Sequence, residues 1–239
     1  MPKRAKMRIV SCIFAVFGLG AGVASALGAQ KPETPHLEFV TEYIRELAAI
    51  ETIRDSAKEE LKEAGDDANE KLSSAIHSNT LFQLELQSEI GMLKGMRLNS
   101  PYDALIPDIA DFYDFKITVY KRLTDIASAF LAGPKPDVDY GGLAVEMPQL
   151  RARLDYLDQT LFHDITPLVF IILIDPKPDS QNHVSHLIIT KAERAILIDT
   201  LTNYFGAKME QKDRNFGVGS ALVLRDSLNQ RKCSDDPWE

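Results

Sequence analysis

Apolar residues recur every three or four positions over most of the chain, and this spacing constrains the fold more than any other feature. Such a stripe covers one face of an α-helix, which must bury that face against other elements. Long stripes run over residues 37–64, 72–93, 106–130 and 143–161, with turn-forming residues between them. The last has the alternating four- and three-residue spacing of a coiled-coil seam. The sequence therefore predicts an all-α fold, an antiparallel bundle of about four long amphipathic helices.

The pattern after the fourth stripe is shorter and interrupted. Thr166–Pro167 breaks the helical period, and a wholly apolar run over residues 168–174 follows. Periodicity alone does not distinguish a buried strand from a helix in so short a run. Because no partner strand is visible elsewhere in the sequence, we expect a helix.

A shorter C-terminal pair of helices is expected to complete the fold. Thr190 and Glu193 have the spacing of a capping box, and Gly206 is a typical helix end, so the first of the pair is predicted between them. The second is predicted around residues 216–228.

The part of the chain that carries these stripes is long enough for one sizeable core. We therefore expect a single helical domain over residues 36–232. Stretches rich in Pro, Gly and Asp predict linkers near residues 133–142 and 175–187. Residues 233–239 are expected to form a polar tail, in which Cys233 has no specific role.

The first 26 residues have the pattern of an export signal. Lys3, Arg4, Lys6 and Arg8 precede an uncharged run from Ile9 to Ala29, and Ala24-Ser25-Ala26 offers a small-residue cleavage site. The sequence predicts a signal peptide over residues 1–26 and a periplasmic or extracellular location. The alternative is an uncleaved inner-membrane anchor that extends to about residue 29, since about 20 apolar residues span a bilayer.

Charge narrows the classes of partner. Without residues 1–26 the chain carries 23 Lys and Arg against 35 Asp and Glu, a net charge of −12. Such a chain repels phosphate backbones, and no basic patch with interleaved aromatic residues compensates. We therefore expect a protein partner and no nucleic acid. Membrane contact is expected only if the N-terminal segment is uncleaved.

The first long helix is expected to carry two parallel tracks of charge. The acidic track contains Glu51, Asp55, Glu59 and Glu63, and the basic track contains Arg54, Lys58 and Lys62. Opposite charges meet three residues apart, which stabilises a helix by a few tenths of a kcal/mol per pair. We interpret these tracks as a solvated face.

Metal-binding chemistry has few candidates. His183 and His186 could share one helix face, and His163 is the other candidate nearby in the sequence. Zinc takes three or four ligands from a protein, so this set does not make a site, and no metal is predicted. An acidic cluster of Asp103, Asp108, Asp111 and Asp114 is expected to be a solvated flank, because a straight helix does not wrap a calcium ion.

Signatures of catalysis and of cofactor binding are missing from the sequence. No G-x-S-x-G elbow and no phosphate-binding P-loop occurs. The glycine-rich stretch at residues 18–22 has Val23 where a dinucleotide-binding turn requires glycine. No catalytic residue and no cofactor is therefore predicted.

Two hypotheses for function follow. The first is an exported, acidic, non-catalytic bundle that serves as an interaction, assembly or sensory module. The alternative is a small-ligand or metal-binding protein, or an enzyme, with a site near the Pro167 kink lined by His163, Asp164, His183 and His186. The first predicts no enclosed polar pocket, whereas the second requires titratable groups that converge in a cleft.

Overall fold

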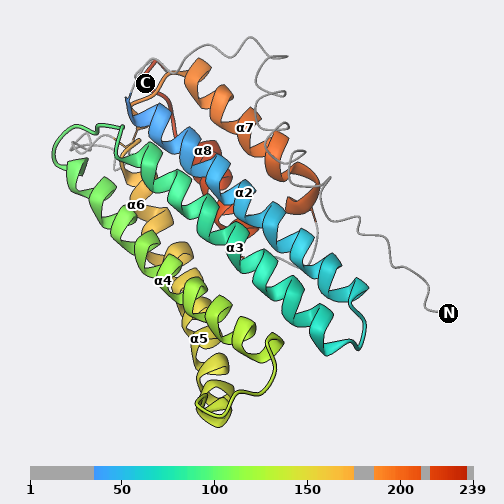
Figure 1. Ribbon diagram of the computed structural model, residues 1–239. Helices are drawn as coiled ribbons and strands as arrows, with labels where there is room; N and C mark the ends of the chain where they lie inside the picture. Colours follow the sequence, from blue (N-terminus) through green and yellow to red (C-terminus); the bar gives the residue numbers. More distant parts are fainter. Residues whose placement is uncertain (1–34, 175–185, 211–215, 236–239) are drawn as a thin grey trace. The chain divides into compact units, whose positions relative to one another are not determined.

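The computed structural model of the chain describes residues 35–174, 186–210 and 216–235. Over these residues the all-α class is confirmed, and the fold is built from helices in the order shown in Figure 1. The predicted signal peptide and His183 lie outside the described residues. None of the described helices combines the length and apolar composition needed to cross a membrane.

The first two long helices form a hairpin. α2 spans Pro35–Glu63 and α3 spans Ala68–Leu93. Gly65 turns the chain between them with a φ of 53°, which glycine adopts without strain. The side chain of Asp67 then caps α3 by accepting hydrogen bonds from the amides of Asn69 and Glu70.

A third helix packs along the second. After the short 3₁₀ turn η1 (Tyr102–Ala104), α4 spans Leu105–Leu131 and lies beside α3 over much of its length (Figure 1). The rings of Phe82 and Tyr120 stack between the two helices with their centroids 4.8 Å apart. Pro107 lies in the first turn of α4, where its missing N–H leaves no carbonyl unpaired.

The fourth long helix, α5, spans Tyr140–Thr160 and packs against α4. The predicted seam is the contact side: Met147, Leu150, Leu154 and Leu157 pack with Val119 and Leu123 of α4. Asp139 caps the helix by accepting a hydrogen bond from the amide of Gly142.

The interruption at Pro167 takes the form of a π-helical turn. η2 spans Leu161–Ile165, and α6 follows over Thr166–Ile171 with Pro167 in its first turn. The prediction of a helix for residues 168–174 is correct as far as Ile171. Beyond it the backbone turns, and Ile174 pairs with Leu187 in an isolated antiparallel bridge.

The C-terminal pair consists of α7 (Lys191–Met209) and α8 (Phe216–Gln230), which pack together and against α2. The capping box is confirmed, since Thr190 and Glu193 bond reciprocally. The predicted end at Gly206 is wrong, because α7 continues through this glycine in helical geometry to Met209.

The segment after α8 is docked on the domain as far as the structure describes it. The amide of Leu187 donates to the carbonyl of Lys232 at 2.8 Å, and the amide of Ser234 donates to the carbonyl of Ile189 at 3.1 Å. Cys233 between them is 0% exposed and belongs to the main core. The expectation that this cysteine lies in a polar tail is therefore wrong, because backbone pairing with residues 187–189 carries it inward.

α2 is the central helix of the fold. It contacts α3, α7 and α8, and Figure 1 shows α3 and α7 along different sides of it. Accordingly it buries side chains around much of its circumference, among them Leu37, Phe39, Val40, Tyr43, Ile44, Leu47 and Ile50. Polar side chains on α2 are thus drawn into the interior, and these define the first candidate site.

Candidate functional site

Two glutamates of the bundle interior face the same three-helix region. Glu46 on α2 and Glu89 on α3 are each 2% exposed. Tyr113 on α4 donates a hydrogen bond from its hydroxyl to Oε2 of Glu46. The Oε1 atoms of both glutamates are buried and have no hydrogen-bond partner among the described residues. An unpartnered buried carboxylate oxygen is costly when charged, so this geometry favours the neutral acid.

The electrostatic surroundings act in the same direction. Burial is the largest cause that raises the pKa of Glu46 to about 8 and that of Glu89 to about 9, and neighbouring carboxylates add to both shifts. Glu42 and Glu85 act on both groups, and Glu46 is the carboxylate with the largest effect on Glu89. Burial together with Glu42 also raises the pKa of Glu85. The hydrogen bond from Tyr113 and the charge of Lys116 oppose the rise at Glu46. Both acids are therefore protonated at neutral pH.

A second buried group joins α2, α4 and α5 through ion pairs. Lys116 is 1% exposed, and its Nζ donates to Oδ1 of Asp158 at 2.8 Å. Arg54 donates to the other oxygen of Asp158 and, at 2.9 Å, to Oε1 of Glu51. Two cations thus balance two anions, and removal of one member would leave a buried charge without compensation.

This group corrects the expected solvated face of α2. The predicted pairs exist, for Arg54–Glu51, Lys58–Asp55 and Lys62–Glu59 all meet at a spacing of three residues. Glu51, however, is 1% exposed, because α2 is covered on several sides at this level. The tracks are solvated only toward the C-terminal end of the helix.

The π-helical turn has its own buried polar contacts. Thr166 is 0% exposed, and its hydroxyl donates to the carbonyl of Leu161 at 2.8 Å. The hydroxyl oxygens of Tyr43 and Ser220 lie 2.8 and 3.2 Å from Oγ1 of Thr166. The carbonyl of Leu161 also accepts the backbone N–H of Thr166, so the hydroxyl contacts add to the backbone bond of the π-helical turn and stabilise the kink.

The residues predicted to line a pocket at this kink do not meet there. His163 and Asp164 are exposed, and the His163 ring packs edge-on against Phe162. His186 is half-buried beside the bridge at Leu187, and His183 lies outside the described residues. Over the described ranges no group of three or more His, Cys, Asp or Glu side chains is placed to hold a metal ion. The acidic residues 103, 108, 111 and 114 are exposed, as expected.

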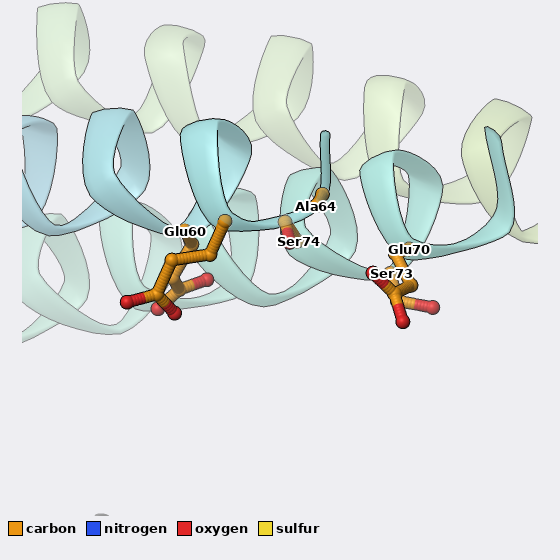
Figure 2. A pocket seen from close by; sticks show the side chains of 6 residues that line it. Glu60, Ala64, Glu70, Ser73 and Ser74 are labelled. Atoms are coloured by element: carbon orange, nitrogen blue, oxygen red, sulfur yellow. The ribbon is translucent and has the colours of Figure 1, made fainter. Parts of the chain in front are cut away.

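An open hollow of about 390 Å³ lies where α2 meets α3. It is lined by Glu60, Glu63, Ala64, Glu70, Ser73 and Ser74. Figure 2 shows the carboxylates of Glu60 and Glu70 pointing away from the two helices. Nε2 of His77 on α3 lies 3.6 Å from Oε1 of Glu60. The hollow is open to solvent and has an acidic lining, so it does not have the form of an enclosed substrate pocket.

The surface feature that stands out is on α5. Gly141, Val145, Pro148, Gln149, Ala152, Tyr156 and Gln159 are all exposed and uncharged. At 3.6 residues per turn they occupy about 100° of the helix, on the side opposite the α4 seam. We call this surface the α5 outer face. Val145 and Tyr156 are 61% and 67% exposed, more than any other large apolar residue of the described chain.

The sequence contained signals for the buried groups that the apolar pattern concealed. Glu46 and Glu89 lie three residues after Tyr43 and Leu86, in phase with the apolar stripes. A charged residue at a stripe position indicates a buried polar contact. The outer face of α5 could likewise be identified once its seam was known. No protein family, curated protein or solved structure matches the chain.

Proposed function

We propose that this chain is an exported, non-catalytic interaction module that binds a protein partner through the α5 outer face. The N-terminal pattern of residues 1–26 supports export, and the acidic composition supports a protein rather than a nucleic acid as partner. The observation that carries the proposal is the exposure of Val145 and Tyr156 near the centre of the α5 outer face, where no charged residue lies.

Composition shows why this face is unusual for a surface. Charged residues make up 26% of the chain, and α5 itself carries Glu146, Arg151, Arg153, Asp155 and Asp158. Asp155 lies at the edge of the arc opposite the seam, as far from its centre as Gln149, and the other four lie outside that arc. Interface centres are depleted in charge and enriched in aromatic residues such as Tyr156. The distribution is that of a docking face with a charged rim.

The buried polar groups also fit a structural rather than a catalytic role. Lys116, Asp158 and Arg54 satisfy one another inside the bundle. Glu46 and Glu89 are enclosed between helices and do not line the open hollow. Catalysis requires such groups to converge where a substrate can reach them. The position of His163 and Asp164 on the surface gives no support to the alternative of a ligand site at the kink.

The proposal is tested by photo-cross-linking in the cells that make the protein. Benzoylphenylalanine replaces Val145, and in a matched strain it replaces Gln87, an exposed residue of α3. We expect a discrete cross-linked product from position 145, no product from position 87, and loss of the product when Ala152→Glu is added to the face. A strain that gives no product at position 145, or one that Ala152→Glu leaves unchanged, contradicts the proposal.

A further inference from the structure

Four glutamates lie together where α3 packs on α2. Glu42 and Glu46 are one turn apart on α2, and Glu85 and Glu89 are one turn apart on α3, so each pair shares a face of its helix. Glu46 and Glu89 are buried, whereas Glu42 and Glu85 are only partly covered. Glu42 and Glu85 each raise the pKa of both buried glutamates, as charges in one region do. We call these four residues the glutamate layer.

The two buried glutamates of this layer have no counter-ion among the described residues. Each has a buried Oε1 atom without a hydrogen-bond partner. Lys116 is the cation whose charge acts on Glu46, but its ammonium group is 2.8 Å from Oδ1 of Asp158 and forms its ion pair there. Ionisation of Glu46 or Glu89 in the closed bundle would therefore leave an unpaired charge in the interior, which costs several kcal/mol.

The other polar groups that face the layer do not compensate such a charge. Tyr43 on α2 shares a hydrogen bond with Thr166, and Tyr113 on α4 donates to Glu46. Burial is the largest cause that raises the pKa of both tyrosines, so these hydroxyls stay neutral. Arg45 pairs with Glu42 at 2.8 Å, but its side chain is half exposed and lies outside the interior. The negative charge of the layer therefore increases with each proton that it loses.

The C-terminal end of α3 is the part of the layer that is free to move. Glu89 lies immediately before the last turn of α3, near the negative end of the helix dipole, and this turn has no basic residue. Among residues 94–100, which follow, only Met96 and Leu98 are not fully exposed. The end of α3 can thus leave α2 without disturbing another helix, a local opening of the kind that native proteins undergo.

We infer that the glutamate layer is a pH-dependent switch, which holds residues 86–93 of α3 against α2 while both buried glutamates are neutral and releases them when these groups ionise. Release brings water to both carboxylates and exposes Leu86, Ile90 and Leu93, which are buried in the closed form. The switch is independent of the α5 outer face and goes beyond the proposed function.

Hydrogen exchange of the purified full protein, read by mass spectrometry, measures the opening of residues 86–93. Each rate is divided by the intrinsic exchange rate at the same pH, which gives the opening equilibrium. Because opening lets each buried acid lose a proton that the closed form retains, this equilibrium should increase roughly tenfold per pH unit for each acid. Between about pH 5.5 and pH 7.5 we therefore expect an increase of roughly hundredfold or more. An opening equilibrium that does not change with pH overturns the inference.

Glutamine variants identify the groups responsible. The double variant Glu46→Gln with Glu89→Gln keeps the size of both side chains and an acceptor for Tyr113, and its opening equilibrium should not depend on pH. The control Glu63→Gln, at an exposed position of α2, should retain the full dependence of the original protein. A double variant that also retains it overturns the inference.

A comparison with α7 separates local release from global unfolding. Leu197 and Leu201 are 0% exposed, so their amides report the opening of the whole domain. Residues 86–93 should exchange at least roughly tenfold faster than these amides, and low concentrations of urea should accelerate exchange in α7 much more, because global unfolding exposes more surface. Exchange of the two segments at the same rate and with the same urea dependence would show global unfolding only and overturn the inference.

Discussion

Replacement of Glu89 by glutamine should stabilise this protein at neutral pH and leave it unchanged in acid. The native state keeps Glu89 protonated up to about pH 9, whereas the unfolded chain ionises it near its ordinary pKa of 4.5. Between these values the native state binds one more proton than the unfolded state. Stability from this group is therefore fully present below pH 4.5 and falls as the pH rises to about 9.

The magnitude follows from the same difference. One pH unit within this window is worth about 1.4 kcal/mol for one group, and pH 7 lies about 2.5 units above 4.5, so the loss at pH 7 is about 3 kcal/mol. Glutamine does not ionise, so Glu89→Gln should be more stable than the original protein by about this amount at pH 7 and equal to it at pH 4.5. Its neutral amide occupies nearly the same volume.

The assay is urea denaturation followed by far-ultraviolet circular dichroism at pH 4.5, 6, 7 and 8.5, conditions chosen to span the window. The matched control is Glu63→Gln, since Glu63 is exposed on α2. We expect the difference in free energy of unfolding between Glu89→Gln and the original protein to increase with pH. The corresponding difference for Glu63→Gln should not change with pH. A Glu89→Gln protein that is less stable at every pH, or whose difference does not change with pH, refutes the assignment of a neutral buried acid.

Three further outcomes are expected. Lys116→Met should lower the free energy of unfolding by about 3–5 kcal/mol, because it leaves the buried carboxylate of Asp158 with one cation instead of two. The control Lys121→Met, on the exposed side of α4, should change the free energy of unfolding by less than about 0.5 kcal/mol. Urea titration of both variants measures the difference. Cys233 should react with a thiol reagent only at the rate of unfolding, and fast labelling in native buffer would contradict its burial. The protein recovered from the exported fraction should lack residues 1–26 by intact mass, and retention of that segment would instead establish the membrane-tethered alternative.

Much of the fold follows from periodicity, since long helices bury stripes that repeat every 3.6 residues. The α4–α5 seam and the capping box of α7 were predictable because each depends on residues close together in the chain. The end of α7 was not, because tertiary contacts around Phe205 and Met209, both buried, carry the helix past Gly206. The docking of residues 232–234 depends on backbone pairing with residues 187–189, which no local pattern reveals.

The buried charges were harder to predict for a different reason. The expectation that charged residues are exposed to solvent places Glu51 on the surface, because it assumes that only one face of α2 is covered. α2 is covered on several sides, which only the packing of α3, α7 and α8 determines. Lys116 could have been suspected, since it is in phase with Tyr113 and Tyr120 on α4. Its partner Asp158 lies on another helix and was not predictable.

The central claim, that the α5 outer face is occupied when the protein is at work, is tested most directly by hydroxyl-radical footprinting in the exported fraction. Tyr156 is 67% exposed and Tyr204 on α7 is 46% exposed, so an unoccupied chain should show faster oxidation at Tyr156. The account predicts the reverse order in the native fraction, with Tyr156 protected, and a return to the original order on dilution. Faster oxidation of Tyr156 than of Tyr204 in the undiluted fraction would contradict it.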